Sequence, residues 1–319
     1  MNKKYCRIIS AILSLIVALL ILSGCVTKES RPTENAVTFT DSLGREVSVE
    51  KNPERVAALI GSFADVWVLS GGSLCATVED AWDDFGLDLP EAINIGGAHS
   101  PNLELLLSSN PDFVIASSST SADVEMKDVL TTAGITVAYF DVDNFEDYIE
   151  MLDICTDITE RKDLYEKNGS AIETQINAIK VDFEKRSLPD NERTVLLLRA
   201  HSGSVKALGS KGTILGEMLA DLGCSNIADS DETLLETISV ESVIRQEPYH
   251  IFVVTMGDDT EKALDNLKQM MNENPAWETL DAVKQDRLHL MDRKLFNMKP
   301  NVRWAESYER LSEILLEKK

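Results

Sequence analysis

The side chains best suited to bind a small molecule in this 319-residue chain follow its predicted strands. Ligands of open α/β sheets bind outside the carboxyl ends of the strands, so the residue types at those positions indicate what the protein holds. The first half has no Lys or Arg from Val56 through Met126, whereas the second half is rich in cations. These cations are Arg199, Lys206, Lys211, Arg293, Lys294, Lys299 and Arg303. We therefore expect an aromatic, weakly acidic wall that faces a cationic wall, which suits an anionic or oxygen-rich chelate, or a macrocycle with carboxylates or a phosphate.

The candidate ligand-binding residues come from both walls. They are Ser62, Phe63 and Trp82 on the first wall, and Arg199, His201, Lys211, Met256, Arg293, Phe296 and Arg303 on the second. Arg199 is the strongest of the cations because it directly ends a predicted strand, although any single cation is also consistent with solvated surface. His201 and Met256 stand at strand ends as well, where either can be an axial ligand of a haem iron. His250 and His289 enter or lie within predicted strands, which indicates structural roles.

The elements that position these side chains occur twice along the chain. Residues 55–60 have the pattern of a buried strand, and a helix over 63–70 follows and stops at glycine. Residues 194–198 have the same strand pattern, and a helix over 214–222 follows and also stops at glycine. This repetition predicts an α/β fold with two lobes, each built on a mostly parallel sheet.

Two glutamates recur in matching surroundings in the two halves. Glu104 and Glu241 each follow an apolar residue and precede an apolar pair, and each stands seven positions before a proline. An apolar, β-rich run comes after Pro111 and after Pro248, which predicts a short helix stopped by proline and then a buried strand. A carboxylate near the start of a helix also stabilises the helix dipole, so the repeat alone assigns no role to the pair.

A segment without proline separates the two halves. Residues 157–186 are rich in Glu, Lys, Ala and Ile, and apolar residues from Ile172 to Phe183 follow helical spacing. A single helix of about 28 residues spans roughly 42 Å at 1.5 Å per residue. We therefore predict one long, rigid helix at 157–186 that joins an N-terminal lobe at 38–156 to a C-terminal lobe at 187–319.

The first residues have the features of a secretory signal. Cations precede an apolar run over 8–22, and small residues and a cysteine follow it. The run is shorter than the roughly 20 apolar residues of a membrane-spanning helix. The stretch at 22–25 (LSGC) resembles the lipobox of bacterial lipoproteins, in which the cysteine is acylated and becomes the new N-terminus. We therefore predict a signal peptide at 1–24, lipidation of Cys25, and a polar tether at 25–37 that anchors the protein outside the cell membrane.

Charge and cysteine content argue against several classes of function. The net charge of −23 disfavours nucleic-acid binding, because an acidic surface repels phosphates. Cys75, Cys155 and Cys224 have no CxxC spacing, so we expect buried thiols and neither a zinc site nor a redox site.

The order of signal, tether, lobe, long helix and lobe resembles the class of ABC-importer solute-binding proteins that includes those for siderophores, haem and cobalamin. Residues 40–49 (TDSLGREVSV) are similar to the opening hairpin of this family, and residues 52–57 (NPERVA) to its first lobe strand. Residues 299–304 (KPNVRW) resemble a motif that precedes the last helix in one bacterial branch. The resemblance covers about residues 38–317.

This resemblance implies a function and its partners. In the family, one glutamate on each lobe docks onto arginine pockets of the permease, and Glu104 and Glu241 occupy those positions here. The chain is then expected to be a receptor and not an enzyme, with no cofactor of its own. Its ligand would be a ferric siderophore, haem or a corrinoid, which it delivers to an ABC permease and its ATPase.

Three other classes stay open. A direct Zn²⁺ or Mn²⁺ receptor of the same broad class needs several converging His and carboxylate ligands, and the chain has four His and no His-rich loop. An enzyme on the same scaffold is disfavoured because the sequence has no GxSxG elbow, P-loop, GxGxxG or HExxH motif. A sensor or adhesin that only displays its lobes would not need Glu104 and Glu241 for uptake.

Overall fold

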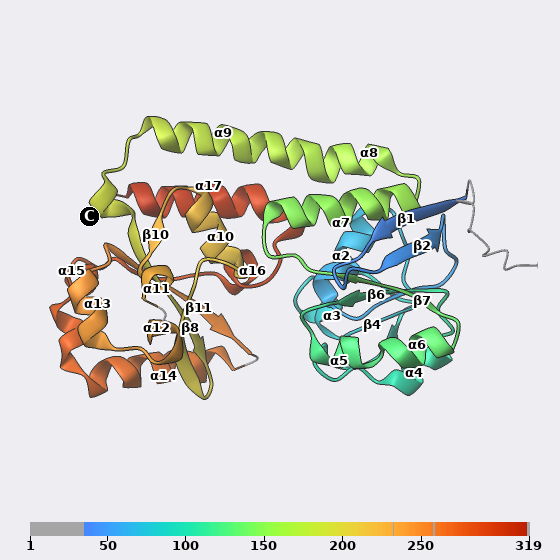
Figure 1. The fold of residues 1–319 in the computed structure, drawn as a ribbon, viewed down its shortest axis with the longest axis horizontal. Helices are drawn as coiled ribbons and strands as arrows, with labels where there is room; N and C mark the ends of the chain where they lie inside the picture. Colours follow the sequence, from blue (N-terminus) through green and yellow to red (C-terminus); the bar gives the residue numbers. More distant parts are fainter. Residues whose placement is uncertain (1–34, 232, 258, 318–319) are drawn as a thin grey trace, which may run out of the picture. The chain divides into compact units, whose positions relative to one another are not determined.

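A computed structural model describes residues 35–231, 233–257 and 259–317 of the chain. The predicted signal peptide, Cys25 and all but the last residues of the predicted tether lie outside these residues. Residues 37–319 form one unit, and Figure 1 shows two larger sheets with helices around them and a separate hairpin of β1 (Ala36–Thr40) and β2 (Glu46–Glu50).

Five parallel strands form the sheet of the N-terminal lobe, in the order β5-β4-β3-β6-β7. They are β3 (Val56–Ala58), β4 (Ala76–Thr77), β5 (Ile93–Asn94), β6 (Phe113–Ser117) and β7 (Thr136–Phe140). All residues of β3 and β6 are buried, as expected of parallel strands that helices cover on both faces. Alternate residues of β6 pack on opposite faces of the sheet, with Phe113 and Ile115 in one core and Val114 and Ala116 in another.

Helices cover the two faces of this sheet. They are α2 (Gly61–Leu69), α3 (Asp80–Asp83), α4 (Leu103–Ser108), α5 (Ser121–Glu125), α6 (Lys127–Thr132) and α7 (Phe145–Ile158). Trp67 of α2 and Tyr148 of α7 pack into the first core, whereas Leu106 of α4 and Leu130 of α6 pack into the second. The predicted strand over 55–60 and helix over 63–70 are thus present as β3 and α2.

The C-terminal lobe has a second sheet in the order β10-β8-β11-β12, with these four strands parallel and β9 antiparallel to β8. The strands are β8 (Thr194–His201), β9 (Ser204–Leu208), β10 (Ser225–Asn226), β11 (His250–Met256) and β12 (Leu288–Leu290). The helices are α10 (Ile214–Asp221), α11 (Ile227–Ser230), α12 (Thr233–Glu236), α13 (Val240–Gln246), α14 (Thr260–Glu273), α15 (Asp281–Lys284), α16 (Arg293–Phe296) and α17 (Trp304–Leu316), with 3₁₀ turns η2 (Asp190–Arg193), η3 (Pro275–Thr279) and η4 (Asn301–Arg303).

The predicted repeat of a short helix, a proline and a strand is confirmed in both lobes. Helix α4 precedes β6, and helix α13 precedes β11. Asn110 and Glu247, which stand directly before the two prolines, both have a left-handed backbone with φ of 47°. A residue in this conformation ends a helix because it turns the chain away from the helix axis. The two halves therefore match in backbone geometry as well as in sequence.

The long helix between the lobes starts later than predicted. Helix runs without a break from α8 (Lys162–Tyr165) through a π-helical turn, η1 (Glu166–Ser170), into α9 (Ala171–Lys185). The prediction of one helix over 157–186 is wrong at its N-terminal end, because α7 extends to Ile158 and Glu160 has a left-handed backbone (φ 54°). That residue separates α7 from α8.

The long helix packs against α7 near one end and against α17 near the other (Figure 1). The π-helical turn contains Gly169, where an added Cβ would lie 3.1 Å from Ile149 Cδ1 and 3.2 Å from Leu152 Cδ2, both on α7. Glycine therefore allows the two helices to approach closely at this turn.

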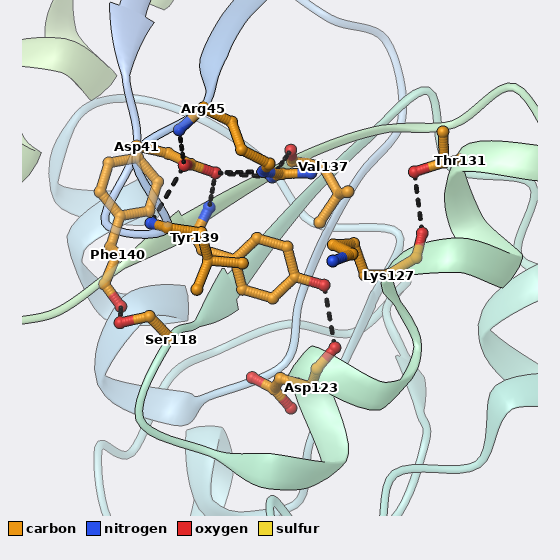
Figure 2. Close-up of polar contacts among 10 residues, drawn as sticks. Asp41, Arg45, Ser118, Asp123, Lys127, Thr131, Val137, Tyr139 and Phe140 are labelled. Atoms are coloured by element: carbon orange, nitrogen blue, oxygen red, sulfur yellow. Dashed lines mark hydrogen bonds and ion pairs between the residues drawn. The ribbon is translucent and has the colours of Figure 1, made fainter.

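One carboxylate fastens a two-stranded hairpin, β1 (Ala36–Thr40) and β2 (Glu46–Glu50), to the edge strand β7 (Figure 2). Asp41 Oδ1 accepts hydrogen bonds from the backbone N–H groups of Leu43 and Arg45. Asp41 Oδ2 accepts from the Arg45 guanidinium and from the backbone N–H of Tyr139. Arg45 also donates to the carbonyl of Val137 and lies 4.9 Å from the centre of the Tyr139 ring. These contacts cover backbone groups that an edge strand would otherwise expose.

The charge of Asp41 is held by these contacts. Burial acts to raise the pKa of Asp41, but the hydrogen bonds and the charge of Arg45 outweigh it, so the pKa lies below its usual value. The carboxylate therefore stabilises the fold above the ordinary carboxyl pKa, and this contribution is lost as the pH falls through the lowered pKa.

Replacement of Asp41 by alanine should lower the free energy of unfolding by about 2 kcal/mol at pH 7, because buried N–H groups and a guanidinium lose their acceptor. Urea unfolding measures this change, and the difference from wild type should shrink in acid. Asp182→Ala is the control, since it removes an exposed carboxylate that pairs with Arg186. It should cost less than about 0.5 kcal/mol. Equal losses for the two variants would contradict the role of Asp41.

Candidate ligand-binding site

The carboxyl ends of β3 and β4 bring the starts of α2 and α3 together. An added Cβ at Gly61 would lie 2.7 Å from the backbone nitrogen of Ala81, so only glycine fits there. Asp80 Oδ2 accepts a hydrogen bond from the Gly61 N–H at 3.3 Å. Asp80 Oδ1 is buried and has no hydrogen-bond partner among the described residues, and burial raises the pKa of this carboxyl. This edge of the sheet thus presents a carboxyl group with unused hydrogen-bonding capacity.

A loop of three serines follows β6 at the same edge. The hydroxyls of Ser117 and Ser119 lie 3.0 Å apart, and the Ser119 N–H donates to Ser117 Oγ. Ser118 is half-buried and Ser119 is exposed, so hydroxyl groups reach the surface here. Asp123 stabilises the start of this loop, because its Oδ2 accepts a hydrogen bond from the Ser117 N–H at 2.8 Å. Figure 2 shows Tyr139 extending from β7 to donate to the backbone carbonyl of Asp123.

Asp123 is a fully buried carboxyl group with one partner for its side chain. Its Oδ1 has no hydrogen-bond partner among the described residues. Burial raises the pKa of Asp123 to about 7, the hydrogen bond from Ser117 opposes that rise, and the charge of Asp80 adds to it. Near neutral pH the acid is therefore partly protonated.

The predicted cationic wall corresponds to the β8–β9 pair of the C-terminal lobe. Arg199 on β8 stands directly across from Lys206 on β9, so the two cationic side chains share one face of the sheet. Arg199 is half-buried, and its Nε has no hydrogen-bond partner among the described residues. Burial lowers the pKa of Arg199, and the charge of Asp143 opposes this shift. His201 pairs with Met256 of β11 at the strand ends, and both side chains are exposed.

Two sets of polar contacts join the lobes. The guanidinium of Arg293 on α16 pairs with the carboxylate of Asp84 at the end of α3, with N–O distances of 3.1 and 3.4 Å. Lys294 Nζ donates to the backbone carbonyl of Asp84 at 2.6 Å. Asn301, before α17, donates from Nδ2 to the carbonyl of Ser62 at 2.9 Å and to Asp65 Oδ2 at 2.7 Å.

The structure brings only some of the predicted ligand-binding residues to the strand ends. Phe63 and Phe296 are 1% and 2% exposed and lie in the hydrophobic core, so they cannot form an aromatic cleft wall as predicted. Phe63 packs edge-on against Phe140 because the third residue of α2 faces the sheet. Arg303, the last residue of η4, forms a salt bridge at 2.7 Å with Glu306 in the first turn of α17.

The other predicted residues remain near the expected edges. Ser62 is buried with a hydroxyl that has no partner among the described residues, and Trp82 is half-buried against the core. Lys211 is exposed in the loop between β9 and α10. Arg293 is engaged with Asp84 instead of being free. Cys25 lies outside the described residues.

Two site residues were not predicted, namely Asp84 and Asp123. Asp84 ends an acidic run that starts at Glu79 and lies within a stretch that has no cation of its own. That imbalance indicates that a cation from a distant part of the chain neutralises one of these acids, although it does not identify which one. Asp123 has no such signal, because only its burial distinguishes it from other acids on surface helices.

The two repeated glutamates occupy equivalent positions. Glu104 and Glu241 are each the second residue of a short helix, and both are exposed. The N-terminal N–H groups of these helices are already capped, by Asn102 in α4 and by Ser239 in α13. Both carboxylates lie at exposed positions, and Glu241 Oε2 accepts a hydrogen bond from Ser239 Oγ at 3.2 Å.

The larger cavities lie elsewhere. A cavity of 540 Å³ lies beside β10, with Ser225 and Asn226 in its lining. Cavities of 720 and 430 Å³ flank α17, on the side of α9 and on the side of α16 respectively. Their charged linings include Arg310 paired with Glu313 and Arg186 paired with Asp182, so these groups already satisfy one another. We assign the candidate ligand site to the strand ends, where buried side-chain atoms of Ser62, Asp80 and Asp123 have no hydrogen-bond partner among the described residues.

The described part of the chain contains no set of three or more His, Cys, Asp or Glu side chains placed to hold a metal ion. None of its helices is long and apolar enough to cross a membrane.

The chain belongs to the periplasmic binding protein family, whose family model matches residues 56–295. It is 25% identical over 312 residues to the uncharacterized ABC transporter substrate-binding lipoprotein YvrC of Bacillus subtilis, with 94% of each chain covered. It is 24% identical over 321 residues to the Fe(3+)-citrate-binding protein YfmC of the same organism, with 96% of each covered. The crystal structure of Staphylococcus aureus SirA with staphyloferrin B superposes with a TM-score of 0.67 at 19% identity, covering 88% of this chain and 97% of that one. The predicted family and two-lobed fold class are confirmed.

Replacement of Asp123 by asparagine should remove a pH dependence of stability. The folded protein holds the Asp123 proton more tightly than the unfolded chain does, so stability is highest below the ordinary carboxyl pKa and falls as the pH rises through about 7. The asparagine side chain mimics the protonated acid, so Asp123→Asn should be about 2 kcal/mol more stable than wild type at pH 8 and close to wild type at pH 4. Thermal unfolding across this range measures the difference.

Asp128→Asn is the matched control for this prediction, since Asp128 is an exposed acid on the neighbouring helix α6. It should leave the pH profile unchanged. A wild-type stability that stays flat between pH 4 and pH 8, or an equal gain for both variants, would contradict the assignment to Asp123.

Proposed function

We propose that this chain is an extracytoplasmic solute-binding receptor, lipid-anchored through Cys25, that captures an iron chelate such as a ferric siderophore and delivers it to an ABC importer. Membership of the periplasmic binding protein family supports the receptor role. The relative YfmC is a Fe(3+)-citrate-binding protein, and SirA is a structural neighbour that holds staphyloferrin B, which supports the ligand class. The receptor binds and releases its ligand without chemical turnover.

The main support for an anionic chelate as the ligand is the pair of cationic residues on β8 and β9. Like charges directly opposite one another destabilise a pair of strands, so Arg199 and Lys206 favour an anion between them. The half-buried guanidinium has an Nε without a partner in the described part of the chain, and a carboxylate can satisfy it together with a second guanidinium N–H. A chelate that carries carboxylates fits this wall better than a bare metal ion, which the cations repel.

The hydroxyl groups of the opposite wall complement this anion site. Ser118 and Ser119 offer donors and acceptors that carry no charge. A chelate with several oxygen atoms can therefore place its carboxylates toward Arg199 and Lys206 and its other oxygens toward the serine loop. Such an arrangement orients the ligand between two chemically different walls.

Haem or a corrinoid is the second ligand class. His201 and Met256 are neighbours on paired strands and are both exposed at the strand ends, where either can approach the iron of a haem. The absorption spectrum of the protein mixed with hemin distinguishes the classes, because axial ligation shifts the Soret band. The Arg199–Lys206 pair favours the anionic chelate.

Ferric citrate should bind the purified mature protein and raise its melting temperature, since a ligand at 100 times Kd adds about 2.7 kcal/mol to stability. The double variant R199Q/K206Q should bind ferric citrate roughly 100-fold more weakly, through the loss of two charge-assisted contacts. K268Q, a change at an exposed lysine of α14, is the control and should bind as wild type does. Tight binding of Zn²⁺ or Mn²⁺ without any chelator, and none of ferric citrate or ferric siderophores, would sink the proposal.

The exposed pair Glu104 and Glu241 supports the delivery step. Each carboxylate can pair with an arginine of the permease through two parallel hydrogen bonds, and one such contact on each lobe orients the receptor. The lipid on Cys25 keeps the receptor at the membrane and raises its effective concentration near the permease.

The double variant E104A/E241A should reduce cellular uptake of the ligand by roughly 100-fold, because two charge-assisted contacts are lost. Its affinity for the ligand in solution should equal that of wild type, because neither carboxylate is among the groups proposed to contact the ligand. The control E125A/E236A also removes one exposed glutamate from each lobe and should retain uptake. Wild-type uptake by E104A/E241A would rule out the docking role and leave a display function.

A further inference from the structure

Asp84 and Arg293 form an unusual contact within this fold. Among the ion pairs of the described residues, theirs alone joins residues of the N-terminal lobe (38–156) and the C-terminal lobe (187–319). Asp84 follows β4 and ends α3, and Arg293 follows β12 and begins α16. Each partner therefore stands at the carboxyl edge of its own sheet, where ligands of such sheets bind.

Two adjacent cations of the C-terminal lobe bind Asp84, one through its carboxylate and one through its backbone carbonyl. The carboxylate of Asp84 accepts from both terminal nitrogens of Arg293, and its backbone carbonyl accepts from Lys294 Nζ. One acidic residue thus occupies two adjacent cations of the C-terminal lobe. The side chains of Asp84 and Arg293 are 17% and 29% exposed, so water and solutes reach the pair.

The lobes do not depend on this pair to stay together. Asn301 is 1% exposed and binds Ser62 and Asp65 of α2. Trp304 is buried and packs edge-on against Phe145 of α7, with ring centres 6.0 Å apart. These buried contacts join the C-terminal segment to the N-terminal lobe. The solvent-accessible pair can therefore open while the junction stays intact.

We propose that Asp84 is a built-in competitor of the ligand: in the ligand-free protein its carboxylate occupies Arg293 and its carbonyl holds Lys294, and an anionic chelate must displace it to use these cations. The inference rests on the proposed function, since it names a residue that limits affinity for the same class of ligand. A ligand carboxylate replaces the Asp84 carboxylate one for one, because both offer two oxygens to the same guanidinium.

This competition makes Asp84 a specificity-determining residue. A chelate without a carboxylate does not exchange with Asp84 and leaves the clasp, the Asp84–Arg293 pair with Lys294, closed. An anionic chelate binds only to the fraction of molecules in which the clasp is open, and its apparent Kd is weakened by that fraction. A partly exposed ion pair shifts such an equilibrium by about fivefold. The clasp thus weakens the binding of every carboxylate ligand, so small carboxylates with low intrinsic affinity do not occupy the site.

The test compares three variants of the mature protein with two probes, ferric citrate and a cationic ferric trihydroxamate that carries no carboxylate. Asp84→Asn should bind ferric citrate about fivefold more tightly than wild type and bind the trihydroxamate unchanged. Arg293→Gln should bind ferric citrate at least about tenfold more weakly, because the ligand loses a charge-assisted pair. The matched control is Asp83→Asn, which removes the same charge from an exposed neighbour one residue away. It should change either Kd by less than about twofold, as expected of a surface charge.

Hydrogen exchange of the ligand-free proteins provides a second readout. Loss of the clasp should speed exchange at residues 80–86 and 292–298 in Asp84→Asn but not in Asp83→Asn. An equal gain in affinity for both variants would assign the effect to net charge and overturn the inference. Weaker binding of ferric citrate by Asp84→Asn would overturn it too, because the pair would then close the lobes around the ligand. In both cases wild-type binding leaves the proposed function standing, whereas no binding of either probe by any protein refutes both.

Discussion

The rest of the structure depends on one apolar core that both lobes share. Phe113 and Ile115 of the first sheet lie in the same buried cluster as Leu197 and Phe252 of the second, and residues of α7, α9 and α17 fill the space between them. Close-packed protein interiors resist deformation. The helices that cross from lobe to lobe are therefore part of a rigid core and not a flexible linker. Packing in this core, away from the candidate ligand site, therefore holds the strand ends of both sheets in place.

The stability of that shared core allows some buried polar groups near the carboxyl edges of the sheets to lack hydrogen-bond partners. Asp80, Asp123, Ser62 and Arg199 each keep a buried side-chain atom without a hydrogen-bond partner in the described part of the chain. Such groups cost stability, so they persist only where the surrounding packing outweighs the cost. The hairpin contributes to this support, because the contacts of Asp41 hold β7, and Tyr139 of β7 holds the carbonyl of Asp123 (Figure 2). A binding site for an oxygen-rich solute requires polar groups that are free to form hydrogen bonds and that the surrounding structure holds in place.

Local patterns predicted the features that depend on neighbours in the chain, whereas contacts between distant residues were not predictable. The helix, proline and strand around Glu104 and Glu241 are set by residues within one turn of helix, and their positions were correct. Arg199 was predicted to end its strand, but β8 extends two residues further to His201. Phe63 follows a strand as predicted, yet the rotation of α2 turns it into the core, and no spacing rule determines that rotation. Arg293 meets Asp84 across 209 positions of sequence, so its partner emerges only from the fold. The pairing of Arg303 with Glu306 follows i,i+3 spacing and could have been predicted.

Ligand capture and proposed docking use the same edge of each sheet. In a parallel α/β lobe, each strand leads at its carboxyl end into the helix that returns the chain to the start of the next strand. Glu104 near the start of α4 therefore lies toward the carboxyl edge of the first sheet, and the backbone N–H of Asn102 bonds to the carbonyl of Ile95, just beyond β5. In the second lobe, α13, which carries Glu241, leads into β11 as α4 leads into β6. A permease that binds both glutamates thus faces the edges that hold Arg199, the serine loop and the Asp84 clasp. The proposed docking therefore uses one local motif, repeated in both lobes, to present the candidate ligand site to the permease.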